Sequence, residues 1–108
     1  MAADLFHKDS SGRWPTPYTI TGDPDEANGP FVFTCEHASN AVGSLKTTPA
    51  DEGLLNSHWG WDIGAAALVE ELANRTNSVG VLAGYSRLII DNNRRTDSNT
   101  LILQYCGE

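Results

Sequence analysis

Basic side chains are scarce in this 108-residue chain, which has 7 Lys and Arg against 14 Asp and Glu and a formal net charge of -7. Nucleic acids and anionic membrane surfaces are bound through clustered Lys and Arg. The shortage therefore argues against both as main partners. Apolar runs of about 18 residues, which could cross a membrane, are also missing, and the first residues lack the apolar segment of a secretion signal. We expect a soluble, cytoplasmic protein.

Cysteine is nearly absent as well. Cys35 and Cys106 lie far apart in the sequence, without a Cys-x-x-Cys pair. This spacing predicts neither a zinc knuckle nor a disulfide framework, and it favours a reducing compartment. A chain of this length buries roughly 65% of its unfolded surface and has room for one core.

The pattern of apolar residues predicts an α/β fold. Strands are expected where short apolar runs occur, with the first of them buried: residues 31–33, 79–85 and 87–91. Apolar residues spaced three and four apart predict a helix over 65–74, with Leu72 on its inner side. Residues 41–56 read as a long loop. The order strand, helix, strand, strand indicates a partial mixed sheet with flanking helices.

The chain divides into two regions. Residues 1–28 are polar and rich in turn-forming residues, and we interpret them as an N-terminal extension with room for a short edge strand at 18–20. Residues 29–108 hold the predicted helix and the apolar runs, and we assign them to the α/β domain.

Polar side chains follow two of the predicted strands. His37 and Asn40 come after the first, and Arg94 comes after the last. Ligands of open α/β sheets bind beyond the carboxyl ends of the strands. Asp62 falls near the predicted helix start, where a carboxylate can act simply as a cap. The arginines at 87, 94 and 95 are either a solvated basic face or a grip for a carboxylate.

Three segments, taken in order, resemble the N-formylglutamate amidohydrolase family. They are Cys-Glu-His-Ala-Ser-Asn at 35–40, His-Trp-Gly-Trp-Asp-Ile-Gly-Ala at 58–65 and Tyr-Ser-Arg-Leu-Ile-Ile-Asp-Asn-Asn-Arg at 85–94. Asp-Ser-Asn-Thr-Leu at 97–101 is similar to the family's continuation, so the resemblance runs from about residue 29 to the C-terminus. The family is similar in fold and site layout to zinc carboxypeptidases and aspartoacylase-like deacylases. The resemblance thus implies metal-dependent hydrolysis of N-formylglutamate or a related N-acyl amino acid.

The resemblance also implies a zinc site. His37 stands in the segment similar to the family's metal-binding turn and is the first expected ligand. Position 40 holds Asn where the wider superfamily usually has a Glu ligand, so Asp62 is the substitute candidate and Asn40 is expected to contact substrate. Bound zinc would polarise the amide carbonyl and activate a water.

Further implied roles concern the substrate. Arg87 resembles the arginine that stabilises the developing oxyanion. Asn93 and Arg94 resemble the Asn-Arg pair that holds the substrate's carboxylate.

Length separates this chain from the family's pattern. Family members typically continue well beyond this point, and the continuation carries a further metal-binding His and the acid/base carboxylate, whereas no His follows His58 here. We therefore expect the N-terminal part of such an enzyme, with an incomplete site. One alternative is a non-catalytic domain that binds a small acidic metabolite through Arg87, Asn93 and Arg94. Another is an interaction domain whose exposed sheet edge leads to self-association.

Overall fold

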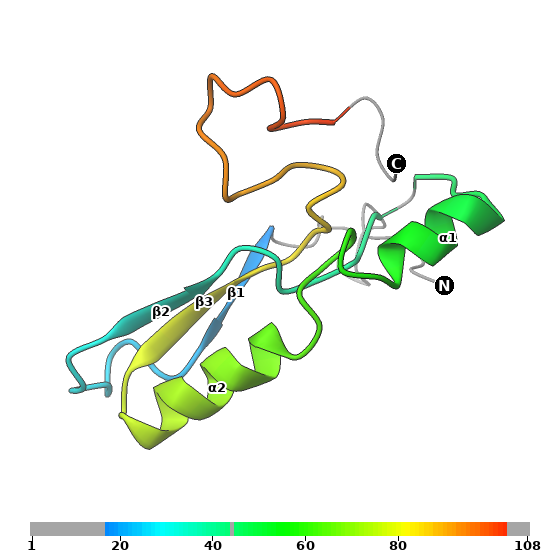
Figure 1. The fold of residues 1–108 in the computed structure, drawn as a ribbon. Coiled ribbons are helices and arrows are strands. Elements are labelled where there is room, and N and C mark those ends of the chain that lie inside the picture. Colours follow the sequence, from blue (N-terminus) through cyan, green and yellow to red (C-terminus); the bar gives the residue numbers. More distant parts are fainter. Residues whose placement is uncertain (1–16, 44, 104–108) are drawn as a thin grey trace, which may run out of the picture.

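The computed structural model describes residues 17–43 and 45–103, so Cys106 and residues 1–16 of the predicted extension lie outside the described part. Three strands and two helices follow one another along this part (Figure 1): β1 (Tyr18–Thr21), β2 (Val32–Cys35), α1 (Pro49–Leu55), α2 (Ala65–Arg75) and β3 (Val79–Ala83). None of the described helices is long and apolar enough to cross a membrane. The helix predicted over 65–74 and the strand predicted over 79–85 are both confirmed, as α2 and β3.

The sheet is mixed, which confirms the predicted α/β class. Its strand order is β1-β3-β2, with β3 in the middle. β2 runs parallel to β3, and Thr34 lies opposite Val81. β1 runs antiparallel to β3, and Ile20 lies opposite the same Val81. β1 is the short edge strand for which the sequence left room. It belongs to the same sheet as β2 and β3, whereas the boundary at residue 28 stays a prediction.

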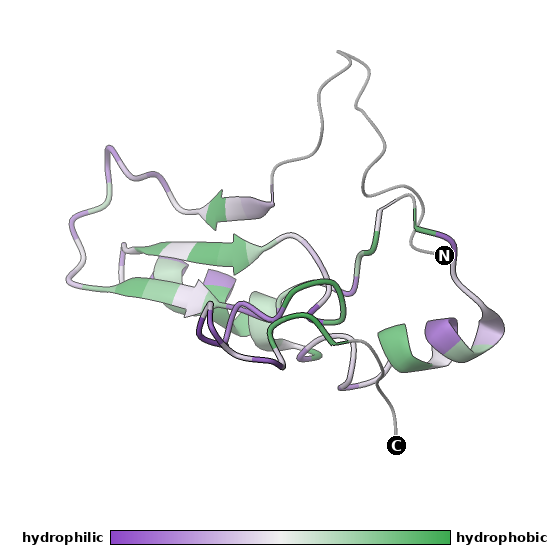
Figure 2. Cartoon of the chain, turned by 90° about the horizontal axis from the view of Figure 1, so that it is seen from above, coloured by the Kyte–Doolittle hydropathy of each residue, from purple (hydrophilic) through white to green (hydrophobic). Residues whose placement is uncertain are grey.

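The position of β2 corrects the expectation of a buried first strand. It pairs with β3 alone and forms one edge of the sheet. Phe31 and Val32 are consequently 51% and 68% exposed, and only Cys35 at the strand's end is buried. A short apolar run cannot by itself distinguish an edge from a central position, since both favour the same residue types. In Figure 2 the apolar colouring follows much of β2 and β3, whereas the connecting loops contain both strongly polar and strongly apolar stretches.

α2 covers one face of the sheet and packs against β2 and β3. The close approach depends on Gly80 in β3, because a Cβ at that position would lie 2.6 Å from Val69 Cγ1. Val69 and Ala73 are the buried residues of the helix. Leu72 remains 36% exposed, so its prediction as a core residue is wrong. The inward stripe is centred on Val69 and Ala73 and places Leu72 at its margin.

α1 corrects the expectation of a loop over residues 41–56. A capping box starts this helix: the Thr48 hydroxyl accepts a hydrogen bond from the Asp51 backbone N–H (3.2 Å), and the Asp51 carboxylate accepts one from the Thr48 N–H (2.7 Å). Pro49, with its fixed φ, suits the first helical position. These reciprocal bonds satisfy two N–H groups that a helix start leaves free.

The third predicted strand, at 87–91, is wrong, because the chain forms a turn there. Ser86 is fully buried, and its hydroxyl oxygen accepts the N–H of Leu88 (3.1 Å). The backbone N–H of Ile89 donates to the Ser86 carbonyl (3.0 Å). Local bonds of this type offer the backbone an alternative to strand pairing, and here they outweigh the apolar pattern.

Candidate functional site

Three loops meet where β2 and β3 end and α2 begins. The parallel pairing of β2 and β3 places both of their carboxyl ends at the same edge of the sheet. The backbone N–H of Asp62 donates to the carbonyl of His37 (2.9 Å), and that of Ser86 donates to the carbonyl of Ala41 (2.7 Å). The Ser86 hydroxyl also donates to the Gly60 carbonyl (2.8 Å). Backbone bonds thus fix the loop before α2 against the loops after both strands.

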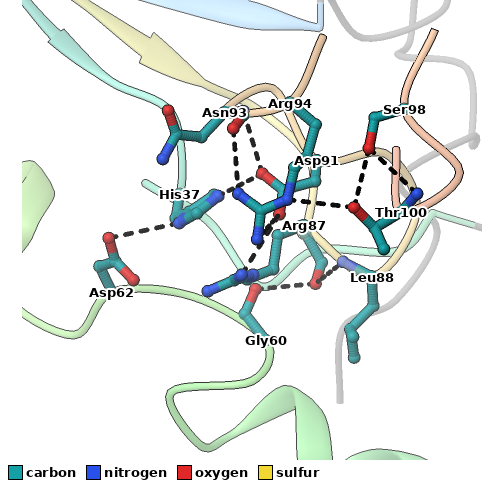
Figure 3. Close-up of polar contacts among 11 residues, drawn as sticks. His37, Gly60, Asp62, Arg87, Leu88, Asp91, Asn93, Arg94, Ser98 and Thr100 are labelled. Atoms are coloured by element: carbon teal, nitrogen blue, oxygen red, sulfur yellow. Dashed lines mark hydrogen bonds and ion pairs between the residues drawn. The ribbon is translucent and has the colours of Figure 1, made fainter. Parts of the chain in front are cut away.

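Asp91 is the centre of this cluster (Figure 3), and only 2% of it is exposed. His37 Nε2 lies 2.6 Å from Asp91 Oδ1, and the backbone N–H of Asn93 donates to the same oxygen (2.9 Å). Arg87 Nη2 donates to Oδ2 (3.2 Å), and Arg94 Nη2 lies 3.9 Å from it. One buried carboxylate therefore gathers four of the residues that the sequence singled out.

The environment of Asp91 favours its ionised form. Burial alone would raise the pKa of this carboxyl, since charge is costly away from water. The hydrogen bond from His37, the backbone N–H of Asn93 and the positive charge of Arg87 act in the opposite direction and prevail. The pKa of Asp91 is accordingly lowered, and the site has a fixed negative charge at its centre.

His37 is held between two carboxylates. It is buried, and its Nδ1 lies 3.4 Å from Oδ2 of Asp62, a half-exposed side chain. In a neutral imidazole that donates its one N–H from Nε2 to Asp91, Nδ1 has no hydrogen. Nδ1 then presents a lone pair to the carboxylate oxygen of Asp62. This arrangement is favourable only when a proton or a metal cation lies between the two atoms.

The donor set also suits zinc in its spacing. Two ligands bound at about 2.0–2.2 Å to a tetrahedral zinc ion lie about 3.3–3.6 Å apart, and the 3.4 Å between His37 Nδ1 and Asp62 Oδ2 falls within this range. Asp91 occupies the place of the outer carboxylate that commonly orients a metal-binding His. Within residues 17–43 and 45–103, no group of three or more His, Cys, Asp or Glu side chains is arranged to bind a metal. His37 and Asp62 are two side chains whose spacing would allow both to bind a metal.

Asp62 does not serve as the helix cap, the other role that the sequence left open. The N-cap of α2 is Gly64, which has a φ of 88° and makes no side-chain cap bond. The Asp62 carbonyl accepts the N–H of Ala65 (3.0 Å), while its carboxylate faces His37. The side chain is therefore available to a ligand.

The remaining predicted residues differ in their placement. Arg87 and Arg94 reach Asp91 from the same turn-rich segment. Asn93 joins them through its backbone N–H. Asn40 has a different partner, since its amide donates to the Asn56 side chain (3.3 Å) at the end of α1.

Cys35 borders the cluster without joining its chemistry. Burial raises the pKa of this thiol, and the negative charges of Asp62 and Glu36 raise it further, against the opposing effect of the His37 backbone N–H. Nucleophilic attack and metal binding need the thiolate. Cys35 is instead a core residue that packs with Val69 and Leu82.

Two residues essential to this geometry received no role from the sequence. Asp91 could have been found from its position, because it stands four residues after Arg87 and three before Arg94, where a shared carboxylate can pair with both. Ser86 gave no comparable signal. Its burial becomes evident only once the loop containing Gly60 packs against it.

Comparisons with known proteins agree with the motifs. A sequence model of the N-formylglutamate amidohydrolase family matches residues 29–107. A structure search found gene product Atu2144 from Agrobacterium tumefaciens, with a TM-score of 0.72 and 26% identity. That match covers 91% of this chain and 37% of the neighbour, so the chain spans little more than a third of its length. No curated protein matches.

The family match includes all three motif segments and every residue that contacts Asp91. This chain belongs to the N-formylglutamate amidohydrolase family.

Proposed function

We propose that the loop cluster around Asp91 serves metal-dependent hydrolysis of N-formylglutamate or a related N-acyl amino acid. The family match supports an amidohydrolase-like function. The observation that carries the proposal is the convergence on one buried carboxylate of His37, Arg87 and Arg94, three side chains for which the family resemblance implies distinct roles. The chain covers only 37% of the similar solved structure, so the hydrolytic activity is part of what we propose.

His37 and Asp62 would hold the metal. When bound, a zinc ion would supply a Lewis acid for the amide carbonyl. Asp91 would accept an N–H at His37 Nε2 and would thereby leave Nδ1, on the side of Asp62, free to bind the metal. His37 is buried, and its ring lies between Asp91 and Asp62.

The two arginines would provide positive charge on the substrate side. Asp91 fixes Arg87, and such a fixed cation can stabilise negative charge that develops on the amide oxygen. Arg94 would grip the substrate's carboxylate, because a guanidinium can offer two parallel N–H donors. Asn93 would assist from the same turn. This division of roles predicts a small substrate that carries both an amide and a carboxylate.

A second candidate is binding of a small acidic metabolite without turnover. It is favoured by the lack of a third metal-binding side chain among the described residues, whereas Arg87 and Arg94 are already in place. This function needs Arg87, Asn93 and Arg94 but no metal.

A zinc titration by calorimetry, followed by an assay of formate release from N-formylglutamate, tests the proposal. Wild type should bind zinc weakly, because two protein ligands are in place, and His37→Ala should abolish the binding. His58→Ala is the matched control, since His58 is exposed and its ring contacts Trp59 in a tilted arrangement.

The outcomes separate the candidates. Zinc-dependent formate release supports the hydrolase. Binding of N-formylglutamate with no release, with or without zinc, supports the metabolite-binding alternative. Equal zinc uptake by wild type and His37→Ala would remove His37 from the metal site.

A further inference from the structure

Two neighbouring arginines have very different partners, although the sequence presents them as a pair. Arg95 is bound side-on by Asp97: its Nε donates to Oδ1 (3.0 Å), and its Nη2 donates to Oδ2 (2.8 Å). This bidentate arrangement uses one edge of the guanidinium and places a negative charge directly beside it. Arg95 is thus occupied, although it is highly exposed.

Arg94 is held differently. Its Nε donates to the Thr100 hydroxyl (3.3 Å), and its Nη1 donates to the Asn93 carbonyl (3.0 Å). Its Nη2 lies 3.9 Å from Asp91, beyond hydrogen-bond distance. Thr100 is itself fixed by Ser98, whose hydroxyl oxygen lies 2.9 Å from that of Thr100 and accepts its backbone N–H (3.2 Å).

These contacts leave some N–H groups on the terminal nitrogens of Arg94 available. A guanidinium has five N–H groups, and Arg94 uses one on Nε and one on Nη1 for hydrogen bonds. The other N–H groups, on Nη1 and Nη2, have no hydrogen-bond acceptor in the described part of the chain. Because Thr100 takes Nε, the N–H groups that Arg94 can still offer to a carboxylate are on its two terminal nitrogens.

The backbone explains how one short segment reaches both arginines. The N–H of Ser98 donates to the Arg95 carbonyl (3.0 Å), and the N–H of Leu101 donates to the Ser98 carbonyl (3.3 Å). The Leu101 carbonyl then accepts the N–H of Asp91 (2.8 Å). Two successive turns therefore bring the segment back to the centre of the site.

We propose that residues 97–100 sort the two arginines, which means that they leave Arg94 able to bind a carboxylate and occupy Arg95. Asp97 removes Arg95 from competition, and Thr100, supported by Ser98, holds Arg94 so that its terminal nitrogens face a carboxylate end-on. Thr100 is a positioning residue that acts through Arg94. The inference rests on the proposed function, in which Arg94 binds the substrate's carboxylate, and it assigns a role to the 97–101 motif.

NMR titration with N-formylglutamate tests the role of Thr100. Thr100→Val keeps the shape of the side chain and removes the acceptor, so binding should weaken roughly three- to tenfold, as expected for the loss of one hydrogen bond. Thr100→Ser restores the hydroxyl and should recover most of the affinity. Thr96→Val, an exposed position in the same segment, is the control and should bind like wild type.

Asp97→Asn tests the sorting of the arginines. Without its partner, Arg95 should become a second, weaker anion site, and the ligand-induced shifts should extend to Arg95 and grow at low salt. Shifts that remain confined to Arg94 in Asp97→Asn would overturn the role of Asp97.

The signal of the Arg94 side-chain Nε–H separates this inference from the proposed function, because it needs no ligand. Its exchange with water should be faster in Thr100→Val than in wild type and normal in Thr100→Ser. If wild type does not bind N-formylglutamate and this exchange pattern holds, the proposed function fails and the positioning role stands. If exchange is equal in all variants, the positioning role is overturned, whatever the binding result.

Discussion

The sheet layer and the loop cluster are held together by different forces. In the sheet layer, β2, β3 and α2 share a small apolar core: Cys35, Ala38, Val69 and Leu82, with Phe33, Ala65 and Ala66 packed against it. Several large apolar side chains of the same elements remain exposed. In the loop cluster, polar bonds converge on Asp91, and its carboxylate is almost completely buried.

This difference predicts how each region responds to damage. Apolar packing is spread over many contacts, so the loss of one side chain is graded by how much surface it buries. A buried charge with fixed partners is less tolerant, because its removal leaves those partners unpaired away from water. The site should therefore be more sensitive than the core to single substitutions.

The largest effect is expected from Asp91→Ala. Removal of this carboxylate leaves His37 and Arg87 without their shared partner, and breaking a buried pair in this way costs about 3–5 kcal/mol. The free energy of unfolding from urea melts measures the loss. Asp97→Ala, which breaks an exposed pair, is the matched control and should cost less than about 1 kcal/mol. Equal losses would mean that the Asp91 cluster is no more critical than a surface ion pair.

Within the sheet layer, Leu82→Ala should cost about 2–5 kcal/mol, because Leu82 is buried in the central strand. Leu72→Ala should cost clearly less, since about a third of that side chain already faces water. The same urea melts measure both losses. A larger loss for Leu72 than for Leu82 would mean that α2 buries Leu72 in the core, as the sequence predicted.

The sequence predicted the sheet layer better than the loops, and the reason is physical. The apolar spacing of residues 65–74 and the run from Val79 report burial against a neighbouring layer, which local sequence encodes directly. The local sequence could not show that β2 is an edge strand, because that depends on which strands lie beside it in the sheet. The turn at 87–91 was missed because the side chain of Ser86, buried only in the folded state, captures a backbone N–H that the apolar pattern assigned to a strand.

The sequence predicted most residues of the candidate site but not how they are arranged. His37, Asp62, Arg87, Asn93 and Arg94 came from motifs, and the structure brings them together. The hub at Asp91 was missed because a carboxylate's value depends on what surrounds it: three cationic or N–H groups reach it from two separate loops. Asn40, in contrast, lies beside α1 because it bonds to Asn56, a contact that spacing along the chain does not reveal.

The smallest effect is expected from substitution of Asp51, which forms the exposed capping box of α1 with Thr48. This substitution tests whether burial is what makes the Asp91 cluster critical. Hydrogen bonds from Thr48 lower the pKa of Asp51. The larger effect comes from the Thr48 backbone N–H and the smaller from the Thr48 side chain, and burial opposes both. Because the folded pKa lies below the unfolded value of about 3.9, the cap's contribution is fully present above that pH. It disappears as the pH falls through the folded pKa.

The chemical shift of the Thr48 N–H follows this loss directly. It should titrate below about pH 3.9 in wild type and lose the transition in Asp51→Asn, with the amides of the first turn exchanging faster at neutral pH. Glu52→Gln removes a second acidic charge from the same turn but leaves the capping box intact, so it should keep the transition. Global unfolding should change far less in Asp51→Asn than in Asp91→Ala, because water replaces the bonds of an exposed carboxylate. A comparable global loss would mean that α1 is as integral to the fold as the Asp91 cluster, and that burial does not set the difference between these two aspartates.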